Sequence, residues 1–252
     1  MIRRDAAWDR IARVRRRFFV GEFRAGQAVI RGEAAHHLNR VLRAKRGQLY
    51  ELSDGEKVWL ARIEKTGGEG VEFALVEELP ARASALALTL LLAVVKFDRF
   101  EWALEKATEL GVSVVVPLAA GRSERRLVKA AANRAARWER VLAEAAQQSR
   151  RVRAPVIEPM APPASAFAAR REALRLLLSE RPGSAPMRTV LAGSESRGAA
   201  LAVGPEGGWT EEEFALAQRC GFQEVSLGTL ILRTETAVAA GLAALNYALG
   251  EG

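Results

Sequence analysis

The chain is poor in cysteine and histidine, and this scarcity excludes several kinds of site. Cys220 is the single cysteine among 252 residues, and His36 and His37 are the only histidines. One cysteine cannot form an internal disulfide, and no Cys and His spacing typical of zinc is present, so we expect no metal site. Because a chain without disulfides suits a reducing compartment, we expect a cytoplasmic protein.

Long apolar segments and the usual nucleotide-binding fingerprints are also absent. The longest apolar candidate, residues 86–95, is too short to cross a membrane and is typical of a strand. The arginine-rich opening lacks the apolar segment of a secretory signal. Neither GxGxxG nor GxxxxGK followed by Ser or Thr occurs, which argues against a Rossmann-type oxidoreductase and a P-loop enzyme.

Positive charge is in excess and unevenly distributed. The chain has 38 Lys and Arg against 30 Asp and Glu, a formal net charge of +8. This balance favours a polyanionic partner such as RNA, with a merely solvated basic surface as the alternative. Arginines are concentrated within residues 1–17 and again at 150–153. We interpret residues 1–15 as a solvated basic arm, whereas Arg16 and Arg17 adjoin two phenylalanines, a combination that can hold phosphate and a base.

Changes in the hydrophobic pattern predict two domains. Residues 16–80 alternate short apolar stretches with glycine-containing turns, which indicates a small β-barrel with a short helix near 33–43. The Asp-Gly pair at 54–55 lies between alternating runs and predicts a hairpin. Residues 78–85 break both periodicities and form the expected linker to a second domain over 85–252.

Strands and helices alternate in the second domain, which predicts an α/β fold with a mostly parallel sheet covered on both faces. The expected strands lie at 86–95, 113–118, 155–158, 174–178, 199–203 and 223–227, and the expected helices at 97–110, 129–149, 164–171, 211–220 and 235–249. Residues 181–188 are expected to form a mobile loop. On the helix at 97–110, we expect Trp102 to pack against its neighbours, with stacking on a base as the alternative.

A glycine-rich turn, GPEGG at residues 204–208, follows one of these strands. We expect Gly204, Gly207 and Gly208 to adopt backbone conformations closed to other residues. A second strand end follows closely, near Ser226. Two neighbouring strand-to-helix loops define a crevice for a small molecule.

Acidic side chains around this turn argue against a phosphate ligand. Glu206 lies in the turn, and Glu211, Glu212 and Glu213 form the first turn of the helix that follows. Thr210 and Glu213 have the spacing of a capping box at the N-terminus of this helix. These carboxylates satisfy the helix N-terminus and repel pyrophosphate. A neutral or cationic ligand such as S-adenosylmethionine suits the turn better, and an ordinary tight turn of an α/β sheet is the alternative.

Five parts of the chain resemble one family of RNA-modifying enzymes. They are RRFFV at 16–20, HHLNRVLR at 36–43, KFDRFEWALEKATELGV at 96–112, EAAQQSRR at 144–151, and the pair GPEGGWTEEE at 204–213 with SLGTLILRTETA at 226–237. In this order they resemble the ribosomal RNA small-subunit methyltransferase E family, whose members methylate N3 of a uridine in 16S RNA and belong to the SPOUT superfamily. The chain departs from the family pattern at Arg150, where Gly or Asn is usual, and at Gln147, where Glu is usual.

The resemblance implies a PUA-like RNA-binding barrel over 16–80, a SPOUT methyltransferase domain with a C-terminal trefoil knot over 85–252, and a homodimer. It also implies S-adenosylmethionine as the cofactor, held by three loops. The implied cofactor-binding residues are Leu178, Ser179, Glu180, Val203, Gly204, Pro205, Glu206, Gly207, Gly208, Ser226, Leu227, Gly228, Leu230, Leu232, Arg233, Thr234 and Ala237.

Candidates for RNA binding and catalysis follow from the resemblance and the charge pattern together. The candidate RNA-binding residues are Arg16, Arg17, Arg43, Gln148, Ser149, Arg150 and Arg151. Arg17, Arg151 and Arg233 are candidates for stabilising negative charge on the uracil carbonyls, and Glu235 is a candidate acceptor of the N3 proton. An ion pair between Arg233 and Glu235 that only braces the loop is an equal alternative.

The leading hypothesis is a methyltransferase that uses S-adenosylmethionine and acts on N3 of a uridine in small-subunit ribosomal RNA, within the assembled subunit. A SPOUT methyltransferase acting on another RNA and a noncatalytic RNA-binding protein are the alternatives.

Overall fold

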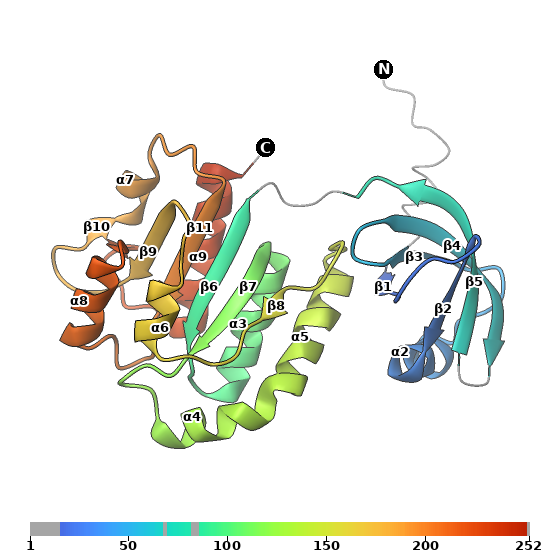
Figure 1. The fold of residues 1–252 in the computed structure, drawn as a ribbon, viewed down its shortest axis with the longest axis horizontal. Coiled ribbons are helices and arrows are strands. Elements are labelled where there is room, and N and C mark those ends of the chain that lie inside the picture. Colours follow the sequence, from blue (N-terminus) through green and yellow to red (C-terminus); the bar gives the residue numbers. More distant parts are fainter. Residues whose placement is uncertain (1–15, 68–69, 82–85, 251–252) are drawn as a thin grey trace. The chain divides into compact units, whose positions relative to one another are not determined.

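The computed structural model describes residues 16–67, 70–81 and 86–250 and divides the chain into two compact units (Figure 1). The first unit contains the residues up to 83 together with 146–154, and the second contains 84–145 and 155–252. The predicted basic arm at 1–15 lies outside the described residues.

A five-stranded sheet with a short helical segment forms the first unit. The elements are β1 Arg17–Phe19, β2 Gln27–Arg31, α2 Gly32–His36, the π-helical turn η1 His37–Val41, β3 Leu49–Ser53, β4 Val58–Gly67 and β5 Gly70–Leu79. The strands pair in the order β1-β3-β4-β5-β2, with β1 parallel to β3 and the other pairs antiparallel. Alternation along the strands buries Phe18, Ile63 and Phe73 in a common core.

The predicted hairpin at 54–55 joins β3 to β4 and is confirmed. Asp54 Oδ1 accepts hydrogen bonds from the amides of Glu56 at 3.0 Å and Lys57 at 2.8 Å. Gly55 has a φ of 96°, a backbone conformation that glycine adopts without steric cost. The turn is therefore specified by its own residues.

A seven-stranded sheet forms the centre of the second unit, in the order β10-β12-β9-β11-β6-β7-β8, and every strand pair in it is parallel. Its strands are β6 Ala87–Ala93, β7 Val112–Leu118, β8 Val156–Ile157, β9 Leu174–Leu178, β10 Ala185–Pro186, β11 Gly198–Val203 and β12 Gln223–Ser226. The helices are α3 Phe97–Glu109, α4 Arg125–Ala131, the 3-10 turn η2 Ala132–Arg134, α5 Ala135–Gln148, α6 Pro163–Ala168, α7 Met187–Leu191, α8 Glu211–Arg219 and α9 Thr234–Leu249. No helix of the described residues is long and apolar enough to span a membrane.

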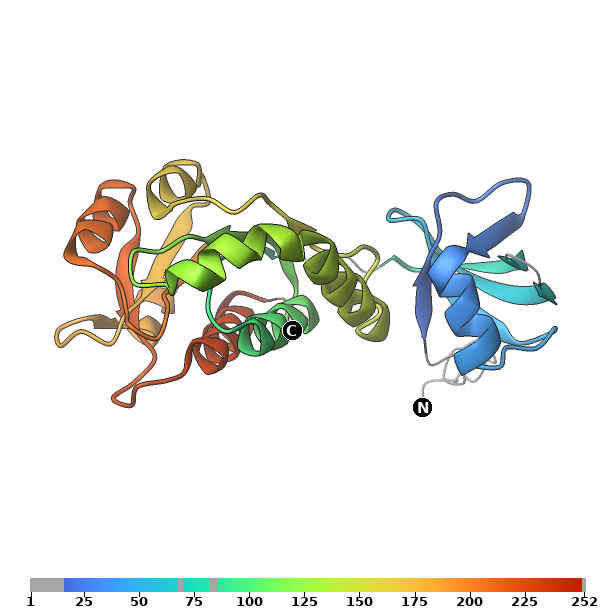
Figure 2. The ribbon, with the colours of Figure 1, turned by 90° about the horizontal axis from the view of Figure 1, so that it is seen from below.

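Helices cover both faces of this sheet, as the alternation of elements predicts. Figure 2 shows α3 and α9 on one face and α6 and α8 on the other. On β6, Leu90 and Leu92 belong to the core beneath α3 and α9, whereas Leu91 and Ala93 belong to the core beneath α6 and α8. Burial on both faces explains the unbroken apolar run in the sequence.

Some predicted elements are wrong in extent. The single helix expected at 129–149 begins earlier, at Arg125, and tightens to a 3-10 turn at 132–134, because Leu127 and Val128 already pack on the core. The loop expected at 181–188 contains β10 and the start of α7, since the side chains of Met187 and Leu191, one helical turn apart, are buried.

Candidate functional site

A cavity of about 370 Å³ lies where β9, β11 and β12 end, in the second unit. These three strands are neighbours in the order β12-β9-β11, and their carboxyl ends meet at one edge of the sheet. This is the edge at which parallel α/β sheets bind ligands. The volume is within the range of small-molecule sites.

Three loops supply the cavity wall. The predicted cofactor residues that line it are Leu178, Ser179, Glu180, Val203, Gly204, Pro205, Glu206, Gly208, Leu227, Gly228, Leu230, Leu232, Arg233, Thr234 and Ala237. Gly207 and Ser226 are not among the lining residues. Side chains that the sequence reasoning missed also line the cavity: Arg122, Arg181, Trp209, Glu211, Phe214, Thr229 and Ile231.

The glycines of the 204–208 turn serve different purposes, and the expectation for two of them is wrong. Only Gly208 has a positive φ, of 70°. A Cβ on Gly204 would lie 3.0 Å from the Trp209 ring, and one on Gly207 would lie 3.3 Å from Arg122 Cβ. At these two positions it is the close approach of neighbouring side chains, and not the backbone conformation, that favours glycine.

Two hydrogen bonds hold this turn, and a third holds the tryptophan that follows it. Thr234 Oγ1 donates to Gly204 O at 3.1 Å, and Arg122 Nη1 donates to Gly207 O at 2.9 Å. The Trp209 indole donates from Nε1 to the carbonyl of Leu178 at 3.0 Å, which connects the turn to the loop after β9. The turn is thus held in place by the residues around the cavity.

The predicted capping box of α8 is confirmed. Glu213 N donates to Thr210 Oγ1 at 3.2 Å, and Glu213 Oε2 accepts from Thr210 N at 2.8 Å. The other oxygen, Oε1, accepts from Gly121 N at 2.8 Å. Because these donors are satisfied within the chain, the start of α8 has less capacity for phosphate than an open helix N-terminus.

Glu206 and Glu235 are both paired with Arg99, a residue outside the predicted set. Arg99 Nη1 donates to Glu206 Oε1 at 2.8 Å, and Arg99 Nε lies 3.9 Å from Glu235 Oε1. The second oxygen, Glu235 Oε2, is buried, and no group of the described residues donates a hydrogen bond to it. Arg99 and Glu235 do not line the cavity, whereas Arg233 does.

The loop after β12 is the most exposed part of the wall. Leu230 and Ile231 are 82% and 78% exposed, and Gly228 has a φ of 147°. The φ of Gly228 is one that residues with a side chain rarely adopt, so the path of this loop depends on glycine at that position.

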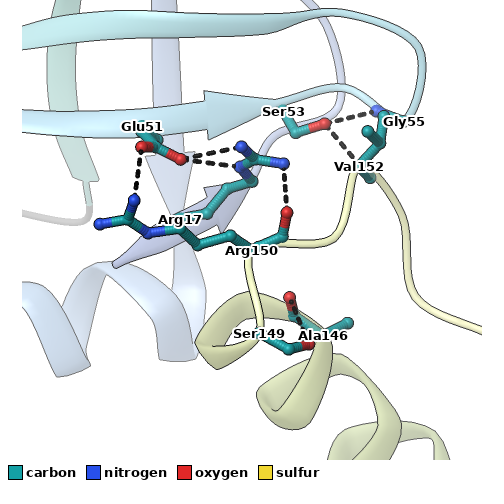
Figure 3. Close-up of polar contacts among 8 residues, drawn as sticks. All are labelled: Arg17, Glu51, Ser53, Gly55, Ala146, Ser149, Arg150 and Val152. Atoms are coloured by element: carbon teal, nitrogen blue, oxygen red, sulfur yellow. Dashed lines mark hydrogen bonds and ion pairs between the residues drawn. The ribbon is translucent and has the colours of Figure 1, made fainter. Parts of the chain in front are cut away.

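The predicted RNA-binding residues belong to the first unit. Arg17 is only 7% exposed, and its Nε and Nη2 donate to Glu51 Oε2 at 3.0 and 2.9 Å (Figure 3). Arg16 is exposed, and its Nη1 lies 2.9 Å from His37 Nε2. Arg43 has a φ of 48°.

The remaining candidates lie together in the segment 146–154. Gln148 and Arg150 are exposed there, and Ser149 and Arg151 are partly buried. Burial and the nearby charge of Arg153 lower the pKa of the Arg151 guanidinium, which remains a cation at neutral pH.

Comparison with known proteins first defines a class. Residues 82–246 match the family model described as an RNA methyltransferase domain. The parallel sheet matches that of SPOUT methyltransferases among solved structures. The ribosomal RNA small subunit methyltransferase E of Synechocystis is 37% identical over 226 residues, which cover 85% of this chain and 71% of that protein. The protein of the same name from Mycobacterium bovis is 32% identical over 228 residues, which cover 87% of this chain and 86% of that protein.

Solved structures agree with these relatives. A methyltransferase of Legionella pneumophila in complex with S-adenosylmethionine has a TM-score of 0.86 at 30% identity, covering 95% of this chain and all of that one. A ribosomal RNA small subunit methyltransferase E of Neisseria gonorrhoeae, bound to S-adenosylmethionine, has a TM-score of 0.83 at 32% identity, covering 93% and 98%. The chain belongs to the ribosomal RNA small subunit methyltransferase E family.

Proposed function

We propose that this protein transfers a methyl group from S-adenosylmethionine to N3 of a uridine in small-subunit ribosomal RNA. The observation that carries the proposal is the cavity at the ends of β9, β11 and β12, lined by three loops. The similar structures from Legionella pneumophila and Neisseria gonorrhoeae both contain bound S-adenosylmethionine.

Carboxylates and the guanidinium groups of Arg122, Arg181 and Arg233 both line the cavity, which suits a ligand that carries charges of both signs, as S-adenosylmethionine does. Glu180, Glu206 and Glu211 line the wall, and the start of α8 is satisfied by its own capping box. Carboxylates favour a nearby cation and disfavour a phosphate. S-adenosylmethionine, when bound, supplies a methyl group activated by a positively charged sulfur.

The chain's own part in the reaction is to position the base and to favour its anion. Uridine N3 becomes a good nucleophile once its proton leaves, so a cation beside the uracil carbonyls lowers the cost of ionisation. Arg233 lines the cavity and is our candidate for this role. Glu235 does not line the cavity and lies near Arg99. We therefore propose that water accepts the N3 proton and that Glu235 holds the first turn of α9 near Arg99.

The first unit is proposed to bind the RNA as a PUA-like domain. Net positive charge and the arginines of 146–154 support a phosphate partner. Family membership supports a C-terminal trefoil knot, a homodimer and a cytoplasmic reaction on the assembled subunit.

Methyl transfer from labelled S-adenosylmethionine tests the function directly. The full chain is incubated with small ribosomal subunits assembled on unmodified RNA, and the label is mapped to a nucleotide. We expect one labelled uridine that resists reverse transcription, because N3 methylation blocks base pairing. Binding of the subunits without any transfer would instead support the noncatalytic alternative. Label that appears only in a parallel incubation with other cellular RNA would support a different substrate.

A further inference from the structure

The first unit is completed by a segment far from its strands in the sequence. Arg150 O accepts a hydrogen bond from Arg17 Nη1 at 2.6 Å, and Val152 O accepts one from Ser53 Oγ at 2.6 Å (Figure 3). The Val152 side chain packs against a small cluster on β4 and β5. Side chains from β1 and β3 thus hold the carbonyls of residues 150 and 152, which flank Arg151.

The carboxylate of Glu51 lies between the two arginines, Arg17 and Arg150, that take part in this contact. It is 2% exposed, and Oε2 accepts both hydrogen bonds from Arg17. Its other oxygen, Oε1, lies 3.7 Å from Arg150 Nη1. Because a buried carboxylate is unfavourable unless it is paired, Glu51 draws both guanidinium groups toward it.

Arg150 has an unusual backbone conformation that these contacts maintain. Its φ is 56°, in the left-handed region that residues other than glycine seldom adopt. Such a conformation persists where surrounding contacts compensate for its cost. Arg17 holds the Arg150 carbonyl, and Glu51 holds the Arg150 guanidinium.

We propose that Glu51 is a positioning residue for RNA binding, which acts through Arg17 and Arg150 to hold residues 149–153 in the conformation that meets the RNA. Arg17 serves as an internal tether, and Arg151 in the held segment contacts phosphate. This inference rests on the proposed function. A segment that is ordered before binding loses less conformational freedom on binding, so affinity rises.

Removing the Glu51 charge distinguishes this role from simple electrostatics. Glu51→Gln deletes a negative charge, which on charge alone strengthens the binding of RNA. The tether predicts the opposite, a weakening of roughly 10-fold. Glu77→Gln is the matched control, because Glu77 is an exposed carboxylate on β5 of the same unit. That variant should bind RNA as tightly as the wild type or slightly more tightly.

The salt dependence of binding separates a tether from a phosphate contact. Arg151→Gln should lower the slope of log affinity against log salt by about 0.7 to 0.9, because one fewer counterion site is displaced. Arg17 is buried and paired, so its replacement should lower affinity at an unchanged slope.

The decisive variant is Arg17→Met combined with Glu51→Leu in the full chain. Apolar replacement of a buried ion pair commonly preserves folding, which a thermal melt verifies. Binding to small subunits assembled on unmodified RNA should fall roughly 10-fold at an unchanged slope, with the affinity for S-adenosylmethionine unaltered. A folded variant with wild-type RNA affinity, or with a reduced slope, would overturn the proposal. Loss of the proposed function would show separately, as a wild type that transfers no methyl group.

Discussion

Gly228 determines the path of the loop after β12. A Cβ there meets no atom within 4 Å, so its φ of 147°, and not crowding, requires glycine. We expect Gly228→Val to weaken S-adenosylmethionine binding by about 10-fold or more, because a strained backbone costs roughly 1–3 kcal/mol and shifts the wall. Calorimetry measures this, and RNA affinity should stay nearly intact.

Gly198→Ala is the matched control for that substitution. Gly198 lies on β11 in the same unit, its added Cβ would be 3.7 Å from Ala87 O, and its φ is not positive. Unchanged cofactor affinity in both variants would mean that the loop backbone does not form the binding wall.

Arg99 joins two parts of the site without lining the cavity. Its bond to Glu206 holds the 204–208 turn beside the first turn of α9. We expect Arg99→Gln to weaken S-adenosylmethionine binding about 2- to 5-fold, the size of a partly exposed ion pair. A double-mutant cycle with Glu206→Gln measures the coupling.

Arg126→Gln provides the comparison for Arg99. Arg126 also pairs with a carboxylate, Glu124, but its side chain is 80% exposed and it is not among the residues that line the cavity. Equal effects of the two substitutions would show that Arg99 acts only through overall charge.

Among single residues, those in the cavity loops are easier to predict from the sequence than the residues that hold these loops in place. Residues such as Leu178 and Gly208 follow strand ends, and strand ends can be recognised in one sequence. Arg99, Arg122 and Trp209 act through contacts with segments elsewhere in the chain. A signal existed for Arg122, since it follows closely on the end of β7.

Among the elements, α9 packs closely on the sheet through Gly241. A Cβ there would lie 2.9 Å from Leu201 Cδ2 and 3.3 Å from Leu178 Cδ1. We expect Gly241→Val to destabilise the protein by about 1–3 kcal/mol through overpacking, measured by urea unfolding. Because Leu178 lines the cavity, cofactor affinity should fall as well.

Ala243→Val separates packing from helix propensity. Ala243 is exposed on the same helix, so only the lower propensity of a β-branched residue applies, about 0.5 kcal/mol. A Gly241→Val variant no less stable than Ala243→Val would contradict the close packing.

Elements with a strong periodic pattern were predictable, as α3 and α8 show, and α8 also has a capping box. The expected 97–110 and 211–220 differ from the observed bounds by a single residue at one end. The short α7 has too few turns to produce a pattern. Trp102 packs only in part, since it is 43% exposed and the Lys106 ammonium lies 5.8 Å from the centre of its ring.

For the whole molecule, large exposed apolar side chains near the C-terminal end support the proposed homodimer. Leu230, Ile231 and Tyr247 are the most exposed of these among the described residues, and Tyr247 is 94% exposed. Exposed apolar surface commonly marks an interface. We expect Tyr247→Glu to raise the monomer fraction in sedimentation equilibrium, since burying a charge opposes association.

Val156→Glu is the corresponding control. Val156 is an exposed apolar residue on β8, the edge strand at the other end of the sheet from β10. A wild type that is monomeric at all concentrations, or equal dissociation by both variants, would contradict an interface at Tyr247.

The parallel sheet was predictable because alternating strands and helices allow few arrangements. It was not predictable, however, which segments of the chain make up the first unit. Residues 146–154 look in sequence like the end of one helix and the loop after it, and their partners lie on β1 and β3. Only long-range contacts reveal that they belong with the first unit.

That discontinuity has a consequence for the newly made protein. Ribosomes deliver the chain from its N-terminus, so the strands up to Leu79 emerge well before Val152. Until residue 154 has left the ribosome, Glu51 can pair with Arg17 but not with Arg150. The apolar cluster on β4 and β5 likewise lacks the side chain of Val152. Translation must therefore proceed through α3, β7 and α5 before the first unit can reach its finished state.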